Sequence, residues 1–196
     1  MFTGIVEATG RVRSVVPENR GASVTIDAGR LDLSDVSIGD SIAVDGCCLT
    51  VVELEPAAFR VDVSQETLDS TIGFEAGATV NLEKALRLSD RLDGHLVSGH
   101  VDGRGEIMRK DQVGESWLLE VRFPPGLERY IPRKGSITVN GVSLTINRVD
   151  ADRFEVNLIP HTLEVTNLRL LRPRAQVNLE VDLLARYIER LVTASG

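Results

Sequence analysis

The stretch SIAVDGCCLT, residues 41–50, returns 95 positions later as SITVNGVSLT, residues 136–145. Six of the ten positions are identical, including the glycine and the closing Leu-Thr pair. The same offset aligns residues 3–6, TGIV, with residues 98–101, SGHV. A repeat of this length is too long for a solenoid unit and has the size of a small domain. The sequence therefore predicts two copies of one fold, and two similar pockets.

Short segments rich in Val, Ile, Leu and Thr recur in both copies, and many of them alternate apolar and polar side chains, which is typical of strands. These segments are residues 41–44, 50–54, 59–63, 79–82, 117–123, 136–139, 144–149 and 154–158. Asp-Gly or Asn-Gly between two of them indicates a tight hairpin. About six strands per copy predict an all-β fold of two tandem six-stranded antiparallel Greek-key barrels. Residues 66–70 and 161–165 interrupt this pattern as short helical turns.

The last segment of the chain follows a helical period instead. From Asp182 onward, apolar residues recur at spacings of three and four, at Leu183, Leu184, Tyr187, Ile188, Leu191 and Val192. A helix this short needs a packing partner to be stable. It would serve either as an oligomerisation helix or as a lid over its own barrel. The expected division is thus a barrel over 1–94, a barrel over 95–181 and a helix over 182–196.

Composition excludes several classes of partner. The formal net charge is −7 and the isoelectric point is near 5.0, which argues against nucleic acid and anionic membranes. No run of 18 apolar residues occurs, and the first ten residues lack the features of a signal peptide, so we expect a cytoplasmic protein. The two cysteines, Cys47 and Cys48, are adjacent and are expected to be reduced. The three histidines lack the spacing of a metal site, so we expect no metal.

Differences between the copies point to the chemistry. Cys48 of the first copy aligns with Ser143, and Ile5 aligns with His100. One copy therefore offers a thiol and the other an imidazole. Each residue also has a plain structural explanation, since a strand cysteine is often a buried small hydrophobe and a histidine after glycine can cap a turn. Taken alone, these residues support only a two-domain β-barrel protein that binds a ligand.

Four motifs resemble the riboflavin synthase family, whose members contain two lumazine-binding domains: MFTGIV at 1–6, GCCLTV at 46–51, HLVSGHVD at 95–102 and GVSLT at 141–145. The resemblance implies a transferase that converts two molecules of 6,7-dimethyl-8-ribityllumazine into riboflavin and 5-amino-6-ribitylaminouracil without a cofactor. It also implies a homotrimer in which the helices associate and an active site forms between the N-terminal barrel of one subunit and the C-terminal barrel of a neighbour. Lumazine synthase is a further partner to consider.

The resemblance assigns site residues as well. In the first pocket it places Gly4, Ile5, Val6, Cys48, Leu49, Thr50, Asp62, Val63, Ser64, Gln65, Glu66 and Thr67. In the second it places Gly99, His100, Val101, Lys134, Ser143, Leu144, Thr145, Asn157, Leu158, Ile159, Pro160, His161 and Thr162.

Roles follow from the same resemblance. His100 is expected to be a proton shuttle and Cys48 a nucleophile or acid/base group. Ser41, Ser143 and Thr145 would position protons or a water molecule, Phe2 would supply an apolar wall, and Asp182 is a weaker candidate. A rival hypothesis is a non-catalytic lumazine or flavin carrier, like the luminescence antenna proteins that share this fold. A carrier needs one good pocket, whereas this chain keeps ligand motifs in both copies.

Overall fold

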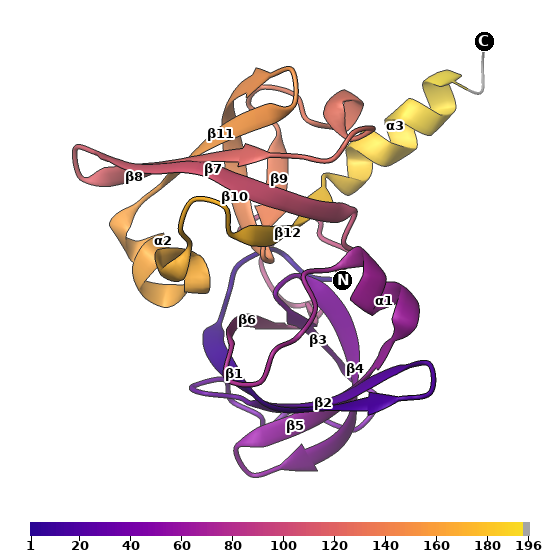
Figure 1. Cartoon of the computed structure of the whole chain (residues 1–196). Helices are drawn as coiled ribbons and strands as arrows, with labels where there is room; N and C mark the ends of the chain where they lie inside the picture. Colours follow the sequence, from indigo (N-terminus) through magenta and orange to yellow (C-terminus); the bar gives the residue numbers. More distant parts are fainter. Residues whose placement is uncertain (194–196) are drawn as a thin grey trace.

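The computed structural model describes residues 1–193 and contains two closed antiparallel barrels, one per copy of the repeat (Figure 1). The first barrel consists of β1 (Ala8–Glu18), β2 (Gly21–Asp27), β3 (Ser41–Val44), β4 (Cys47–Glu55), β5 (Ala58–Ser64) and β6 (Thr79–Lys84), with α1 (Gln65–Ser70) after β5. The second consists of β7 (Gly103–Val113), β8 (Ser116–Arg122), β9 (Ser136–Val139), β10 (Val142–Asp150), β11 (Arg153–Leu158) and β12 (Gln176–Val181), with α2 (Pro160–Val165) after β11. The short 3-10 helices η1 (Glu128–Tyr130) and η2 (Asn167–Leu170) and the terminal α3 (Leu183–Thr193) complete the chain.

Both barrels have the same strand order, which confirms the predicted fold. The first runs β1-β2-β5-β4-β3-β6, and the second has the equivalent circular order β7-β8-β11-β10-β9-β12. In each, three hairpin-connected strands are followed by a strand that returns beside the first of them, which is the Greek-key arrangement. The β3–β4 turn holds Asp45 and Gly46 at positive φ, and Asn140 and Gly141 do the same between β9 and β10. These are the residue types that a two-residue hairpin turn requires.

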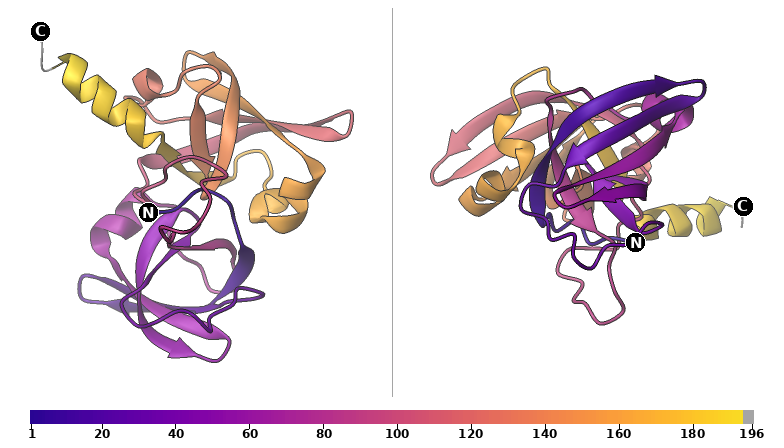
Figure 2. Two further views of the ribbon diagram at one scale, coloured as in Figure 1. Left: turned by 180° about the vertical axis from the view of Figure 1, so that it is seen from behind. Right: turned by 90° about the horizontal axis from the view of Figure 1, so that it is seen from below.

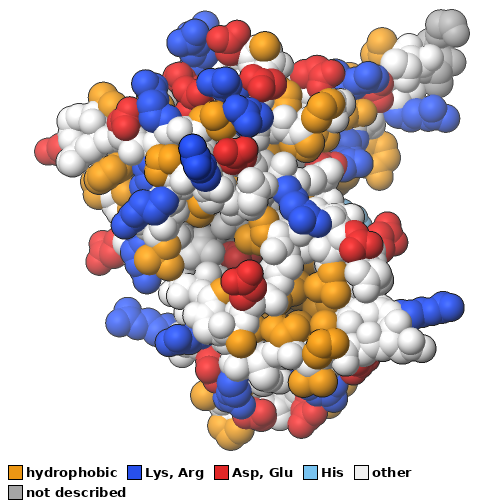
Figure 3. Space-filling model, in the orientation of Figure 1, with side chains coloured by type: hydrophobic (Ala, Val, Ile, Leu, Met, Phe, Trp, Pro, Cys, Tyr) orange, Lys and Arg blue, Asp and Glu red, His pale blue; other side chains and the backbone are white. Residues whose placement is uncertain are grey.

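Each barrel encloses its own apolar core. Alternate residues of the strands point inward, so that Phe59 fills the first core and Phe154, at the matching position, fills the second. The outward-facing side chains of the same strands are not part of the core, and the candidate site is built from them. On the face drawn in Figure 3, basic and acidic side chains are interspersed over both barrels.

The two barrels meet across a pseudo-twofold axis. Phe2 and Val97, which align in the repeat, form a two-way backbone bridge with N···O distances of 2.8 and 3.1 Å. The turns around Gly46 and Gly141 lie against one another, and a Cβ on either glycine would come within 2.7 Å of the other's nitrogen. Equivalent surfaces of the two copies are therefore in contact, as in an isologous dimer.

Buried amide side chains extend this interface symmetrically. Asn81 Nδ2 donates to the Asn140 carbonyl at 2.9 Å, and Asn178 Nδ2 donates to the Asp45 carbonyl at 2.9 Å. The symmetry is broken at Asp45, where the first copy has a carboxyl group and the second copy has the amide of Asn140. Burial raises the pKa of Asp45 to about 7.

The helix α3 points away from both barrels (Figures 1 and 2). Its polar side holds it in place: Glu189 accepts hydrogen bonds from Arg129 at 2.8 Å and from the Tyr130 hydroxyl at 3.3 Å, and Arg186 pairs with Asp102. The apolar stripe stays exposed at Leu184, Tyr187, Ile188, Leu191 and Val192. The helix is therefore not a lid over its own barrel. Residues 194–196 of the predicted segment 182–196 lie outside the described residues.

The predicted strands and helical turns are all present, but four strands lacked a clear signal. These are β1, β2, β7 and β12. The outer parts of β1 and β7 carry Pro17, Asp111 and Gln112 and are exposed on both faces, so their sequence has no apolar alternation. They form strands because each pairs over its length with a neighbour, β2 or β8.

Candidate functional site

The ligand segments assigned from sequence coincide with a place where two strands separate. The ladder between β4 and β5 begins at the pair Val51–Val61, and residues 48–50 and 62–64 lie beyond it. In the second barrel the ladder between β10 and β11 likewise begins at Ile146–Val156. Edges that do not pair with one another leave backbone donors and acceptors for another group. Each barrel thus has an equivalent open edge.

A segment from the opposite copy meets each open edge. The backbone nitrogen of Cys48 donates to the carbonyl of Gly99 at 2.8 Å, and the nitrogen of Ser143 donates to the carbonyl of Gly4 at 2.8 Å. Val101 packs on the first barrel's core, and Val6 packs on the second. The grouping expected from sequence was therefore wrong in one respect, because the two leading segments are exchanged between the barrels. A linear alignment cannot show this exchange, since it compares the copies and not their contacts.

The exchange brings together the two groups that the sequence had separated. His100 directly follows Gly99 and is exposed beside the edge that carries Cys48. We call this arrangement of Cys48, Thr50 and residues 99–101 the thiol face. We call the arrangement of Ser143, Thr145 and residues 4–6 the hydroxyl face. The thiol face holds both a thiol and an imidazole, whereas the hydroxyl face has Ile5 at the place of His100.

Glycine is required where each segment arrives. Gly99 has φ +80° and lies so near that a Cβ on it would be 2.5 Å from Cys48 Cβ. Gly4 has φ +75° and a Cβ there would be 2.7 Å from Ser143 Cβ. Only glycine combines this backbone conformation with so close an approach.

Two buried carboxylates hold the segments in position. Glu83 accepts hydrogen bonds from the Thr3 nitrogen at 2.6 Å, the Thr3 hydroxyl at 2.7 Å and the Gly4 nitrogen at 3.0 Å. Glu180 accepts the three equivalent bonds from Ser98 and Gly99 at 2.7, 2.7 and 3.0 Å. Burial raises the pKa of both carboxyl groups, and their hydrogen bonds oppose that shift. Neither carboxylate was identified as important from sequence, although both lie in the repeated Asn-Leu-Glu.

The adjacent cysteines face opposite sides of β4. The Cys47 side chain is 5% exposed in the barrel core, and burial raises the pKa of its thiol to about 12. The Cys48 side chain is half-buried on the outer surface against Phe2 and Val97. Only Cys48 can therefore meet a ligand. Phe2 is fully buried, and it forms the floor beneath Gly99 and Cys48.

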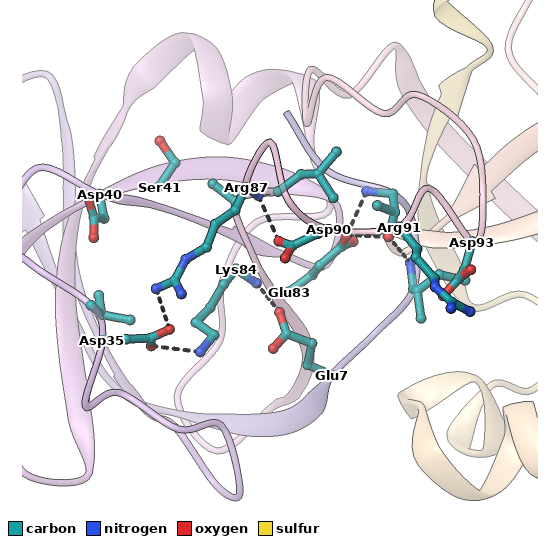
Figure 4. Close-up of a pocket in the computed structure, with 15 residues that line it drawn as sticks. Glu7, Asp35, Asp40, Ser41, Glu83, Lys84, Arg87, Asp90, Arg91 and Asp93 are labelled. Carbon is teal, nitrogen blue, oxygen red and sulfur yellow. Dashed lines mark hydrogen bonds and ion pairs between the residues drawn. The ribbon is translucent and has the colours of Figure 1, made fainter.

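Ser41 lies on the same outer surface, opposite Thr50 in the β3–β4 register. It lines a cavity of about 600 Å³ between the first barrel and the linker that follows β6 (Figure 4). Ile5 lines the same cavity. Its wall is charged, since Asp35 pairs with Lys84 and with Arg87 at 2.7 Å each. The volume is within the range of small-molecule sites.

Lys134 occupies an exposed turn before β9 with φ +68°, a backbone conformation that residues other than glycine rarely adopt. The matching residue of the first copy is Gly39, whose φ is +98°. Both backbone nitrogens make the equivalent bond at 2.8 Å, to Ile146 and to Val51. The lysine thus carries a backbone cost that the first copy avoids.

Several assigned residues cannot contact a ligand through their side chains. Inward alternation places Leu49 and Val63 in the first core and Leu144 and Leu158 in the second. Only their backbone groups remain as candidates. The outward members of the same segments are exposed: Thr50, Asp62, Ser64, Gln65, Glu66, Thr145, Asn157, Ile159, Pro160 and His161. Thr67 and Thr162 are half-buried on α1 and α2.

One further polar residue of this site was not assigned from sequence. His95 is 8% exposed, and its Nδ1 lies 2.8 Å from the Ser143 hydroxyl. Its only sequence signal was its place in the motif that also contains His100. Among residues 1–193, no cluster of His, Cys, Asp and Glu has the geometry to hold a metal ion. None of the helices in that range is both long enough and apolar enough to span a membrane.

Comparisons with known proteins find relatives that match both copies of the repeat. The family model described as "Lumazine binding domain" matches the chain twice, over residues 3–85 and 98–182. Riboflavin synthase of Photobacterium leiognathi is 44% identical over 194 residues, which cover 98% of this chain and 89% of the relative. Riboflavin synthase of Mycobacterium tuberculosis is 44% identical over 209 aligned positions that cover all of both chains. The crystal structure of LumP complexed with riboflavin has a TM-score of 0.85 at 26% identity, covering 92% of this chain and 99% of that one.

Proposed function

The chain belongs to the riboflavin synthase family, and we propose that it catalyses the reaction of that family through the two unlike faces described above. Two molecules of 6,7-dimethyl-8-ribityllumazine exchange a four-carbon unit, which gives riboflavin and 5-amino-6-ribitylaminouracil. The two products together contain all the atoms of the two substrates. The reaction therefore needs no external electron acceptor.

The observation that carries the proposal is the inequality of the two faces. Two identical substrates must play different parts, one donating four carbons and the other accepting them. The thiol face brings Cys48 beside His100, and the hydroxyl face has Ser143 and Ile5 at the matching positions. Similar edges with different chemical groups suit that division of labour.

The acid/base steps are assigned to His100 and Cys48. The 7-methyl group of the substrate is acidic because its carbanion is delocalised into the ring system. An exposed imidazole can accept that proton and return one later, which is general acid/base catalysis. Ser41, Ser143 and Thr145 then position protons or a water, and the backbone edges of residues 48–50, 62–64 and 143–145 hold the heterocycles. The positive φ of Lys134 supports a ligand contact for its side chain.

Holding the two heterocyclic rings face to face supplies much of the rate enhancement that acid/base catalysis does not account for. Juxtaposing two reactants converts a bimolecular step into a unimolecular one, a gain of up to roughly 7 to 11 kcal/mol in well-oriented systems. Each chain carries one face of each kind. We propose that the N-terminal barrel of one subunit faces the C-terminal barrel of a neighbour in the active site.

The exposed stripe of α3 supports the association of subunits that such a site requires, and the family resemblance implies that the assembly is a homotrimer. Tyr187 and Ile188 are 64% and 60% exposed while the helix is held by its polar side. We propose that 182–196 is the oligomerisation segment after barrels at 1–94 and 95–181, that the enzyme works in the cytoplasm, and that lumazine synthase is a candidate partner.

Sedimentation of the wild type should give the mass of a trimer. Ile188→Glu should reduce that mass, whereas Val16→Glu, at an equally exposed residue of β1, should not. A monomeric wild type would contradict this assembly.

The function is tested by mixing the purified protein with the lumazine and following both products. Consumption of two lumazines for each riboflavin formed is the expected result. The rival carrier function predicts tight binding without turnover, and that outcome would reject the enzyme. The carrier is the weaker candidate because the riboflavin-bound LumP structure is 26% identical, whereas the riboflavin synthases are 44% identical.

A further inference from the structure

His95 is a buried histidine whose ring has a fixed position. Its backbone nitrogen donates to the Thr3 carbonyl at 3.1 Å, and the residue before it, Gly94, has no room for a Cβ, which would lie 2.0 Å from that same oxygen. Nδ1 lies 2.8 Å from the Ser143 hydroxyl oxygen. Nε2 is buried and has no hydrogen-bond partner among residues 1–193. The imidazole therefore makes one polar contact, and that contact is with the hydroxyl face.

This environment selects one tautomer. Burial lowers the pKa of His95, against the opposing effect of the Asp182 carboxylate, so the ring is neutral near pH 7 and carries a single N–H. A proton on Nε2 would leave a buried N–H without an acceptor, and such orphaned donors are rare in folded proteins. A proton on Nδ1 leaves only the lone pair of Nε2 without a hydrogen-bond donor. The N–H therefore belongs on Nδ1, where it donates to the Ser143 oxygen.

The direction of the hydrogen bond from His95 to Ser143 determines whether the Ser143 hydroxyl can donate to a ligand. A hydroxyl has one proton to donate, and an oxygen that already accepts from His95 keeps its own O–H for another acceptor. We propose that His95 is a positioning residue that makes the Ser143 hydroxyl a hydrogen-bond donor toward a carbonyl or ring-nitrogen acceptor of the ligand on the hydroxyl face. Cys48, the matching residue of the thiol face, is a much weaker donor. The two faces then differ in polarity as well as in reactivity.

Taking the lumazine as that ligand rests on the proposed function. In the mutational test, riboflavin formation is measured for His95→Phe, His95→Asn, Ser143→Ala and the double variant His95→Phe/Ser143→Ala. Asparagine can place an amide N–H where Nδ1–H lies, and phenylalanine keeps the ring without a donor. One neutral hydrogen bond corresponds to a change of about 10-fold in kcat/KM. We expect that loss for His95→Phe and for Ser143→Ala, near wild-type values for His95→Asn, and no further loss in the double variant.

Two results would overturn the inference: losses that multiply in the double variant, or His95→Asn as impaired as His95→Phe. A thermal unfolding curve for each variant separates misfolding from a lost contact, and binding of riboflavin, followed by its fluorescence, gives a second readout. The tautomer itself is tested by ¹⁵N NMR of the histidine-labelled protein. The expected signal is a protonated Nδ1, and a protonated Nε2 would refute the proposal. Because the NMR measurement needs no turnover, an inactive wild type would reject the proposed function without deciding this inference.

Discussion

The thiol face and the hydroxyl face have the same frame and different side chains. Each has an open strand edge, an incoming glycine at positive φ and a buried glutamate that holds the incoming segment. The frame repeats because it is made of backbone contacts that the duplicated sequence specifies twice. The side chains on it, His100 against Ile5 and Cys48 against Ser143, were free to diverge. Duplication thus supplied the geometry, and a few outward positions supply the difference.

The largest effect should come from removing the imidazole from the incoming segment of the thiol face. His100→Gln removes the proton shuttle, and loss of a general acid/base group lowers kcat by about 100-fold or more. Ligand binding should change by less than about threefold, because the imidazole acts in the chemical step. Adding Ile5→His to the His100→Gln variant should not recover the activity, because it places an imidazole on the hydroxyl face instead of the thiol face. An unchanged kcat in His100→Gln would refute the assigned role.

The second-largest effect should come from a change in the backbone frame that the two faces share. Gly99→Ala forces a Cβ against Cys48 at positive φ, and overpacking with backbone strain should cost about 3 kcal/mol of stability and lower turnover. Gly73→Ala is the control, since Gly73 has a similar φ of +74° but no atom within 4 Å of the added Cβ. It should cost only about 1 kcal/mol. Equal shifts in thermal unfolding for the two variants would show that the close approach is unimportant.

A smaller effect should come from converting the thiol to the residue of the other face. Cys48→Ser keeps the size of the side chain, so binding should be retained while kcat falls by about 10-fold as the more reactive thiol is lost. Cys47→Ser serves as a control for cysteine loss in general, because that side chain lies in the core and should affect stability instead. Steady-state kinetics and riboflavin binding distinguish the two outcomes. A Cys48→Ser enzyme with full kcat would exclude a thiol role.

The smallest effect on turnover concerns the interface between the barrels, where the change is one of stability. The pKa of Asp45 is raised to about 7 in the folded protein from 3.8, so the folded state holds this proton more tightly than the unfolded chain. Stability therefore falls as pH rises from about 4 to 7 and then levels off. Asp45→Asn, which copies Asn140, should gain up to about 4 kcal/mol at pH 8 and nothing at pH 4. The reciprocal Asn140→Asp should lose stability at pH 8. A pH-independent difference in unfolding temperature would contradict this explanation.

Much of this arrangement was visible in the sequence. The repeat, its hairpin turns and the alternation of residues such as Phe59 and Phe154 predicted two barrels, and the mismatched pairs pointed to the positions to which we assign the chemistry. The exchange of residues 4–6 and 99–101 was not predictable, because it depends on how one barrel docks on the other. The same holds for Glu83 and Glu180, whose importance comes from the segments they hold. His95 was overlooked because its partner, Ser143, is distant in sequence.

The crossing of the leading segments also bears on how the chain is made. The first barrel can close as soon as β6 has been synthesised, yet its Cys48 edge waits for Gly99, and Gly4 waits for Ser143. Until residue 97 has been synthesised, Phe2 therefore lacks its backbone bridge to Val97. Contacts this distant along the chain also form slowly. Because a segment of the opposite barrel completes each face, both faces are fully assembled only after the second barrel has folded.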